Sequence, residues 1–295
     1  ANPTRPTYLY IPSEVAVVDA PLARPAYAGG FPVVVHSHGH AAWQSHSYII
    51  GEGLAALGVV FIAPGHVDDQ IFDLNGMHDD VDDFYERVYD IRRTLDMLED
   101  MPAGDPLRGR CNTSRVVMTA HSRGSSTTWA TLGATIDKTG LLARCAAGEF
   151  DASTGCPAEK LAVYDLPMRD PRVVGGIPMA GDGDPWWFGG APGMSAVSVP
   201  VLMMSASLND VGDGTLMSDV HGPPLTWVEF AGGCHDLFAS AACGADIDNS
   251  IAQPAIRTYI YAFLRAHVLD DTSPTTTSIL DGSTSLTSIV TFRSQ

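Results

Sequence analysis

Short apolar runs rich in β-branched residues alternate along the chain with segments of helical periodicity. The first run covers 31–36, a helix is expected over 47–57, and a second run covers 58–63. Further strands are predicted at 115–120, 173–179, 200–205 and 225–230, and a last helix at about 255–267. Strands that alternate with helices indicate an α/β fold, with a mostly parallel central sheet and helices on both of its faces.

The acidic stretch 79–100 also has helical periodicity. Its apolar residues recur every three or four positions, at Val81, Phe84, Val88, Ile91, Leu95 and Leu98. This spacing predicts an amphipathic helix whose many aspartates form the solvated face rather than a calcium site.

No internal repeat, heptad pattern or long linker divides the chain, so we expect one domain over 1–270. The segment 138–172 interrupts the alternation, and it is either a partial cap over the cleft or a surface loop remote from it. The Ser/Thr-rich segment 271–295 is either an edge strand or a tail.

Charge excludes two classes of partner. The formal net charge is −17, and only two lysines, Lys138 and Lys160, are present. Such a chain has no basic stripe for the phosphates of nucleic acid or for anionic lipid. No apolar run approaches the roughly 18 residues of a membrane-spanning helix, so we expect a soluble protein.

The five cysteines form two close couples and one remainder. Cys145 is near Cys156, Cys234 is near Cys243, and Cys111 is left over. Both couples lie in loop-like sequence, where a disulfide is more useful than a buried thiol, so we expect two disulfides and a secreted or periplasmic protein. Five reduced thiols in a cytoplasmic protein is the alternative.

The predicted strand 115–120 ends directly at His121-Ser122-Arg123-Gly124, and a helix is expected from Ser125 onward. A serine on a sharp strand-to-helix turn exposes its hydroxyl at the carboxyl end of the sheet, and small residues two positions away on each side allow the turn. Those neighbours are Ala120 and Gly124. Ser122 is therefore the candidate nucleophile.

A serine needs a base to take its proton, and the base needs a partner that fixes its tautomer. Asp210 follows the strand 200–205, and His235 follows the strand 225–230. The order Ser122, Asp210, His235, with each residue just past a different strand, predicts a catalytic triad. Asn209 and Asp213 share the loop with Asp210, and Asp213 is the alternative acid.

Acyl transfer also needs N–H donors for the developing oxyanion. The backbone amide of Arg123, directly after the nucleophile, is the first candidate. The loop after the strand 31–36 contains His38-Gly39-His40, and we assign the second donor to the backbone amide of His40.

The stretches FPVVVHSHGH, GVVFIAPGHVDD, RVVMTAHSRGSS, VPVLMMSASLND and AGGCHDLF resemble the α/β-hydrolase superfamily over roughly residues 30–268. In pattern they are nearest to its dienelactone-hydrolase-like branch, which holds platelet-activating-factor acetylhydrolases and bacterial cutinase-like polyesterases. The resemblance implies a serine esterase that uses no cofactor. The chain departs from the family pattern at Ala120, by one apparent extra residue before Asp210, and in the segment 138–172.

Two other functional classes remain open. His36, His38 and His40 alternate, which would place three imidazoles on one face of a strand and predict a zinc-dependent hydrolase. That interpretation does not explain the Ser, Asp, His order. The other class is a binding protein that keeps the fold with an inactive site.

Aromatic residues at the carboxyl end of the sheet are candidate walls of the substrate cleft. Trp186 and Trp187 lie in a Gly/Asp-rich loop after the strand 173–179, and Trp43 follows the His38-Gly39-His40 loop. Flat apolar walls predict a permissive enzyme for short to medium acyl or aromatic esters, and for polyesters.

Overall fold

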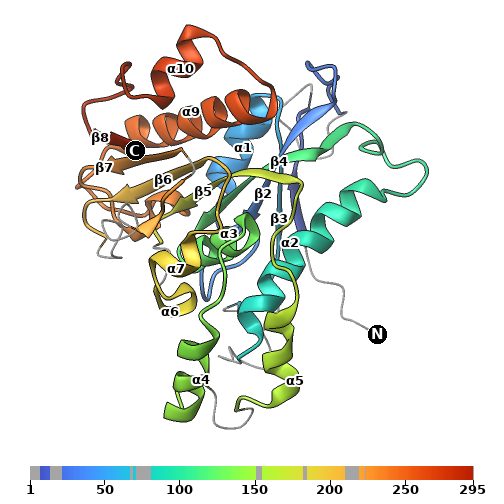
Figure 1. Cartoon of the computed structure of the whole chain (residues 1–295). Coiled ribbons are helices and arrows are strands. Elements are labelled where there is room, and N and C mark those ends of the chain that lie inside the picture. The colour runs from blue at the N-terminus through green and yellow to red at the C-terminus, as the bar shows by residue number, and fades with distance from the viewer. Residues whose placement is uncertain are drawn as a thin grey trace.

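Eight strands form one sheet in the order β1-β3-β2-β4-β5-β6-β7-β8 (Figure 1). The computed structural model describes residues 7–13, 22–66, 69–70, 81–150, 155–181, 185–209, 219–222 and 224–294. The central strands are parallel to one another: β2 (Phe31–Ser37), β3 (Val60–Pro64), β4 (Cys111–His121), β5 (Val173–Met179), β6 (Val201–Ala206) and β7 (Leu225–Phe230). The edge strands β1 (Thr7–Tyr10) and β8 (Val290–Ser294) run antiparallel to their neighbours.

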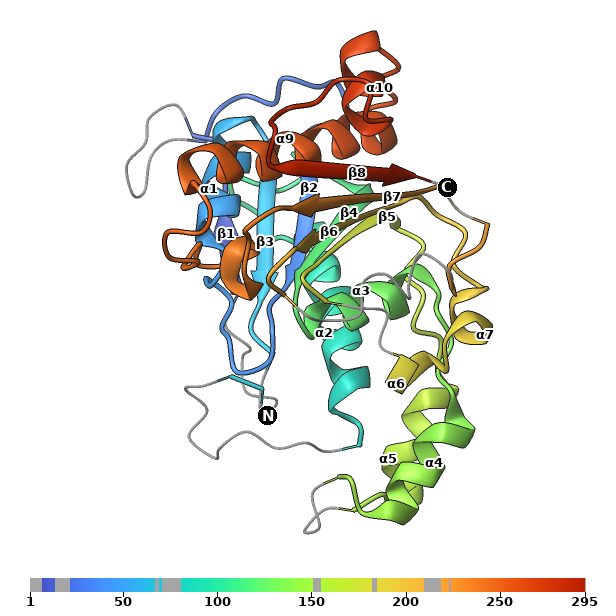
Figure 2. The ribbon, with the colours of Figure 1, turned by 90° about the vertical axis from the view of Figure 1, so that its left-hand side faces the viewer.

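Helices cover both faces of this sheet, and each face has its own apolar core. The strands alternate their side chains between the two cores, as Val33 and Val35 do against Val34. One core includes α2 (Asp83–Glu99) and α3 (Gly124–Leu132), and the other includes α1 (Tyr48–Ala56), α9 (Asn249–Val268) and α10 (Pro274–Leu280). The predicted α/β fold, with a mostly parallel central sheet and helices on both faces, is confirmed, and Figure 2 shows the layers with the β8 edge toward the viewer.

The polar face of α2 differs from the prediction. Asp90 is 3% exposed, although the aspartates of this helix were expected to face solvent, and Arg87 is 1% exposed. The expectation is wrong at Asp90. Both side chains are buried because they bind polar groups near the carboxyl ends of β2 and β3.

The two ends of the chain contain elements that the periodicity did not predict. β1 extends the sheet next to β3, and α9 begins at Asn249 rather than near Ala255. The helix continues through Pro254 because the apolar residues on both sides of it, Ala252 and Ile256, are buried in the core. Within the segment 271–295, the described residues 271–294 include α10 and then β8, which is the edge strand that was one of the two predicted alternatives.

The segment 138–172 forms α4 (Lys138–Ala147), α5 (Ala158–Leu161) and the 3-10 turn η1 (Ala162–Asp165). In Figures 1 and 2, α4 and α5 project beyond the sheet, near α6 (Pro185–Phe188); α7 (Ala191–Met194) follows. The segment is anchored to the start of α2, where the Tyr164 hydroxyl donates to the carbonyl of Val81 at 2.5 Å. Whether it caps the cleft stays a prediction.

Both expected disulfides are present, Cys145–Cys156 and Cys234–Cys243, and Cys111 is a free thiol. Burial raises the pKa of the Cys111 thiol to about 11, so this thiol is inert near neutral pH. Within the described residues, no helix combines the length and apolar character that a membrane crossing requires.

Peptide mapping without reduction should recover both disulfides and leave Cys111 as a thiol that is alkylated more slowly in the folded protein than in the unfolded protein. Replacing Cys145 and Cys156 together by serine should lower the free energy of unfolding by about 3 kcal/mol, because the unfolded chain regains the entropy of an open loop. The ratio of folded to unfolded protein in urea measures this loss. Two unlinked couples in protein from its native compartment would contradict the assignment.

Candidate active site

Ser122 lies at the turn between β4 and α3 with a φ of 53°. A positive φ is strained for a residue with a side chain, and such strain concentrates at functional sites. Two hydrogen bonds hold the turn in place: the amide of Ser122 donates to the carbonyl of Met179 at 2.9 Å, and the amide of Ser125 donates to the carbonyl of Ser122 at 2.8 Å. Ser122 therefore lies on a sharp, strained strand-to-helix turn, and its role as nucleophile stays a prediction.

Glycines allow the chain to pass close to this turn. A Cβ at Gly124 would lie 2.2 Å from the carbonyl oxygen of Ser37, so no larger residue fits there without a backbone shift. A Cβ at Gly39 would lie 3.1 Å from the Cβ of Ser122. The loop His38-Gly39-His40 therefore passes directly beside Ser122, as the oxyanion-hole prediction for His40 requires.

His235 begins the 3-10 turn η2 (His235–Phe238), which follows β7. The disulfide of Cys234 with Cys243 holds the residue before it. On the other side, His121 Nε2 donates to the carbonyl of His235 at 2.9 Å, and the two imidazole rings are 4.7 Å apart between centroids. Because His121 precedes Ser122, this contact brings the elbow and the His235 loop together.

A row of aromatic rings extends from His235 toward Trp43. His121 is 5.9 Å from His46, and His46 is 4.5 Å from Trp43, measured between ring centroids. Burial lowers the pKa of His121 to about 3, so His121 is neutral at physiological pH. Burial also lowers the pKa of His235, and the nearby carboxylate of Asp236 offsets part of that effect. The candidate base is therefore neutral and able to accept a proton at pH 7.

The predicted acid, Asp210, lies outside the described residues, as does the alternative Asp213. The described residue that meets the imidazole is Asn209, whose Oδ1 is 2.9 Å from His235 Nδ1. Asp210 as the triad acid stays a prediction. Sequence reasoning did not assign a role to Asn209, although it follows the end of β6 as the predicted acid does.

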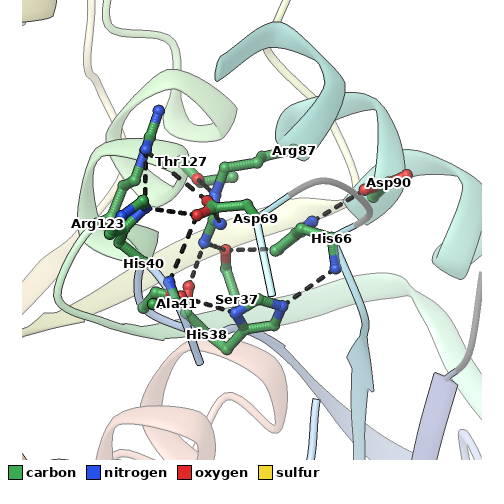
Figure 3. A network of polar contacts seen from close by, with 11 residues as sticks. Ser37, His38, His40, Ala41, His66, Asp69, Arg87, Asp90, Arg123 and Thr127 are labelled. Carbon is green, nitrogen blue, oxygen red and sulfur yellow. Dashed lines mark hydrogen bonds and ion pairs between the residues drawn. The ribbon is translucent and has the colours of Figure 1, made fainter. Parts of the chain in front are cut away.

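A buried ion pair lies beneath the His38-Gly39-His40 loop (Figure 3). Arg87 Nη1 binds one carboxylate oxygen of Asp69, and the other accepts from His40 Nδ1 at 2.6 Å. Burial alone would raise the pKa of the Asp69 carboxyl, but Arg87, the hydrogen bond from His40 and Arg123 together lower it well below its ordinary value. Asp69 is therefore ionised at every pH at which the protein is expected to work.

Arg87 also holds the loop that contains the candidate oxyanion donor. Its Nη2 donates to the carbonyl of His38 and to Ser37 Oγ, and its Nε donates to Thr127 Oγ1 at 3.2 Å. These bonds join α2 to the end of β2 and to α3. The guanidinium thus fixes the position of the backbone next to His40.

His66 closes the network from the end of β3. Its Nδ1 is 2.9 Å from Asp90 Oδ2, its Nε2 is 2.9 Å from Ser37 Oγ, and its backbone N–H donates to His38 Nε2 at 3.1 Å. Figure 3 shows the His38 ring with its bond to the backbone of His66. His38 Nδ1 donates to the carbonyl of Gly39 at 2.8 Å, so both ring nitrogens are engaged.

The three alternating histidines do not converge on one point. His36 Nδ1 is bonded to Thr119 Oγ1 at 3.0 Å, while His38 and His40 bind the partners just described. In the described part of the chain, no group of three or more His, Cys, Asp and Glu side chains is arranged to hold a metal ion. The geometry therefore gives the zinc hypothesis no support.

The tryptophans predicted to line the cleft differ in their surroundings. Trp187 is 4% exposed and stacks on Phe84 at 4.5 Å between centroids, so its ring packs within the core. Trp43 is partly exposed beside His46. The side chain of Trp186 lies outside the described part. A substrate contact by any of the three stays a prediction.

No family model and no curated protein matches the chain. Among solved structures, the chain is similar to a ferulic acid esterase from Streptomyces cinnamoneus, with a TM-score of 0.59 and 18% sequence identity. The similarity covers 93% of this chain and 76% of the other. At this identity the comparison shows a shared fold.

Replacing Arg87 by methionine should lower the free energy of unfolding at pH 7 by about 3–5 kcal/mol, because Asp69 then stays buried without its main counter-charge. Chemical denaturation measures the loss. The double variant Arg87→Met/Asp69→Asn should be less destabilised than Arg87→Met alone, since it removes the unpaired charge as well.

The direction in which pH changes the free energy of unfolding of these variants can be predicted. In the natural protein the Asp69 pKa is depressed, so its contribution to stability is present above the ordinary aspartate pKa and is lost only as pH falls well below it. In Arg87→Met, burial should instead raise the pKa of Asp69. Lowering the pH from 7 to about 4.5 should therefore reduce the loss in free energy of unfolding relative to the natural protein. A deficit that does not change with pH would contradict the ion-pair account.

Proposed function

We propose that this protein is a serine hydrolase of carboxylic esters, with Ser122 as nucleophile and His235 as base. The observation that carries the proposal is the strained elbow at Ser122, bordered on one side by Gly39 and joined through His121 to His235. A positive φ at a serine between a parallel strand and a buried helix is the arrangement that serine hydrolases of this fold use. The similarity to a ferulic acid esterase supports the same class of reaction.

The reaction follows from these positions. His235 Nε2 accepts the proton of Ser122 Oγ as that oxygen attacks the ester carbonyl carbon. The oxyanion that forms is bound by the backbone amides of Arg123 and His40. The C–O bond of the ester then breaks, the imidazolium gives its proton to the leaving alcohol, and the acyl group remains on Ser122. Water, deprotonated by His235, then attacks the acyl carbon. The bond between that carbon and Ser122 Oγ breaks, the imidazolium returns its proton to Ser122 Oγ, and the acid leaves.

Substrate preference is proposed from the walls of the site. The ring of His46 contacts both Trp43 and His121, and Trp43 is partly exposed. Trp43 therefore offers a flat apolar face near the reacting carbonyl. Such a face holds an acyl chain or aromatic ring by burial, at about 25 cal/mol per Å² of apolar area. We propose short to medium acyl or aromatic esters as substrates, and polyesters as a further class. The fold that the chain shares with a ferulic acid esterase is consistent with aromatic esters.

Secretion or export to the periplasm is proposed from the two disulfides, since such bonds persist in oxidising compartments. One disulfide holds the segment 138–172, and the other ties down the loop of the candidate base. Both would be open in a reducing cytoplasm.

A fluorophosphonate probe should label Ser122, and mass spectrometry of the labelled peptide identifies the site. Ser122→Ala should lower kcat/KM for an aryl acetate by at least about a thousandfold while the fold persists, because members of a triad act as a unit. Chelators should leave the natural protein unaffected. A folded Ser122→Ala protein with full activity would refute the assignment, and loss of activity on chelation would move it to a metal enzyme.

Trp43→Ala and Trp187→Ala form a matched pair. Trp43→Ala should reduce kcat/KM for a bulky aromatic ester more than for an acetate, because only the bulky acyl group reaches the indole. Trp187→Ala should lower the free energy of unfolding by about 3–5 kcal/mol through loss of core packing and should affect both esters alike. Kinetics on the two esters together with thermal melting separate these effects. The reverse ranking would place Trp187, and not Trp43, on the substrate wall.

A further inference from the structure

The contact between Asn209 and His235 joins two loops that backbone hydrogen bonds already hold together. The amide of Ser207 donates to the carbonyl of Phe230 at 3.0 Å, and the amide of Leu208 donates to the carbonyl of Gly233 at 2.9 Å. In the other direction, the amide of Gly232 donates to Ser207 Oγ at 2.9 Å. The loop after β6 is thus hydrogen-bonded to the loop after β7. These bonds lie just before Asn209 in the first loop and just before His235 in the second.

Both partners are also fixed individually. The amide of Asn209 donates to the carbonyl of Ala206 at 2.9 Å, which closes a turn directly after β6. His235 is held by the Cys234–Cys243 disulfide and by the bond from His121 to its carbonyl. The 2.9 Å distance from Asn209 Oδ1 to His235 Nδ1 therefore results from constrained backbone on both sides.

We propose that Asn209 is the residue that orients His235, so that this site uses a Ser–His–Asn arrangement in place of Ser–His–Asp. The inference rests on the proposed function and names the third member of its site. Asn209 acts through His235 and does not touch the substrate, so it is a positioning residue.

The amide oxygen can perform one of the two tasks of a carboxylate. As an acceptor it keeps the proton on His235 Nδ1, which leaves Nε2 free to take the proton of Ser122. The second task, stabilising the imidazolium that forms during the reaction, requires a negative charge, which an amide lacks. The Nδ2 of Asn209 is buried and has no hydrogen-bond partner among the described residues. A carboxylate would occupy nearly the same volume.

The charges around His235 are consistent with a neutral partner. His121 from the end of β4 and His46 from the loop before α1 face it, and Asp236 is next to it on η2. Burial lowers the pKa of His235, and Asp236 only partly offsets this. A site of this kind keeps its base neutral to lower pH than one with an aspartate at the same position.

The test replaces Asn209 by Asp and by Ala, with Asp210→Asn and Asp213→Asn as matched controls in the same loop. The pKa of His235 is measured by NMR titration of its ring, which needs no substrate, and kcat/KM for an aryl acetate is measured from pH 4 to 9. Fluorophosphonate labelling of Ser122 and thermal melting are recorded for each variant.

Asn209→Asp should raise the pKa of His235, and the acid limb of kcat/KM with it, by about one to three pH units, because a carboxylate then bonds the imidazolium. Its kcat/KM on the alkaline plateau should rise by about tenfold or more. Asn209→Ala should lower kcat/KM on the alkaline plateau. The pH at which kcat/KM falls on the acid side should not rise. If Asn209 orients His235, Asp210→Asn and Asp213→Asn should change the pKa of His235 much less than Asn209→Asp does.

The opposite pattern overturns the inference. If Asp210→Asn or Asp213→Asn lowers the pKa of His235 and abolishes activity while both Asn209 variants resemble the natural protein, that aspartate is the acid. If Asn209→Asp does not fold, Asn209→Ala and the two controls still decide between the residues. If the natural protein neither hydrolyses esters nor takes up the probe, the proposed function fails, and the NMR titration still reports separately on the bond to Asn209.

Discussion

The ion pair between Arg87 and Asp69 is buried against the loop His38-Gly39-His40, and several segments distant in sequence meet at it (Figure 3). A buried guanidinium is tolerated only when its donors are satisfied and its charge is balanced. Arg87 meets both conditions by binding Asp69, a backbone carbonyl of the oxyanion loop and a hydroxyl of α3. The position of that loop is therefore coupled to the packing of α2 and α3, and a change in the core displaces the amide that would bind the oxyanion.

This coupling explains how the strained backbone at Ser122 persists. Strain of this kind survives only where the surrounding structure over-determines the conformation. At Ser122 the surroundings are a hydrogen bond to β5, a buried helix that starts two residues later, and the close passage of Gly39 and Gly124 against neighbouring backbone. Relaxation of the turn would require the loop held by Arg87 to move as well. The turn at Ser122 and the loop His38-Gly39-His40 are therefore coupled to each other through these contacts.

The elements on which the site is built could be predicted, because apolar periodicity reports the face that a strand or helix buries. The positions of Ser122 and His235 just past strand ends could be predicted for the same reason, while their catalytic roles stay predictions. The polar network of Arg87, Asp69 and Asp90 could not be predicted. Arg87 and Asp90 occur in a helix rich in charged residues, and its hydrophobic periodicity does not show which polar positions are buried. The contact of Asn209 with His235 was also not predicted, because a carboxylate was preferred at that position; Asp210 as the triad acid stays a prediction. Which of two adjacent loop residues faces a histidine depends on turn geometry that periodicity does not encode.

The net charge of −17 has little influence on the basicity of His235, because the local surroundings decide it. Exposed carboxylates more than about 10 Å away are screened at ordinary ionic strength. Close to the ring, the described neighbours include the neutral imidazole of His121, the ring of His46, the amide of Asn209 and the carboxylate of Asp236. The carboxylate of Asp69 in the adjoining network is balanced by Arg87. Desolvation therefore outweighs the attraction of Asp236, and it lowers the pKa of the candidate base within a strongly acidic protein. The burial that keeps His235 neutral also deprives its imidazolium of solvent stabilisation, so the rate of proton transfer depends on what the residue facing Nδ1 supplies.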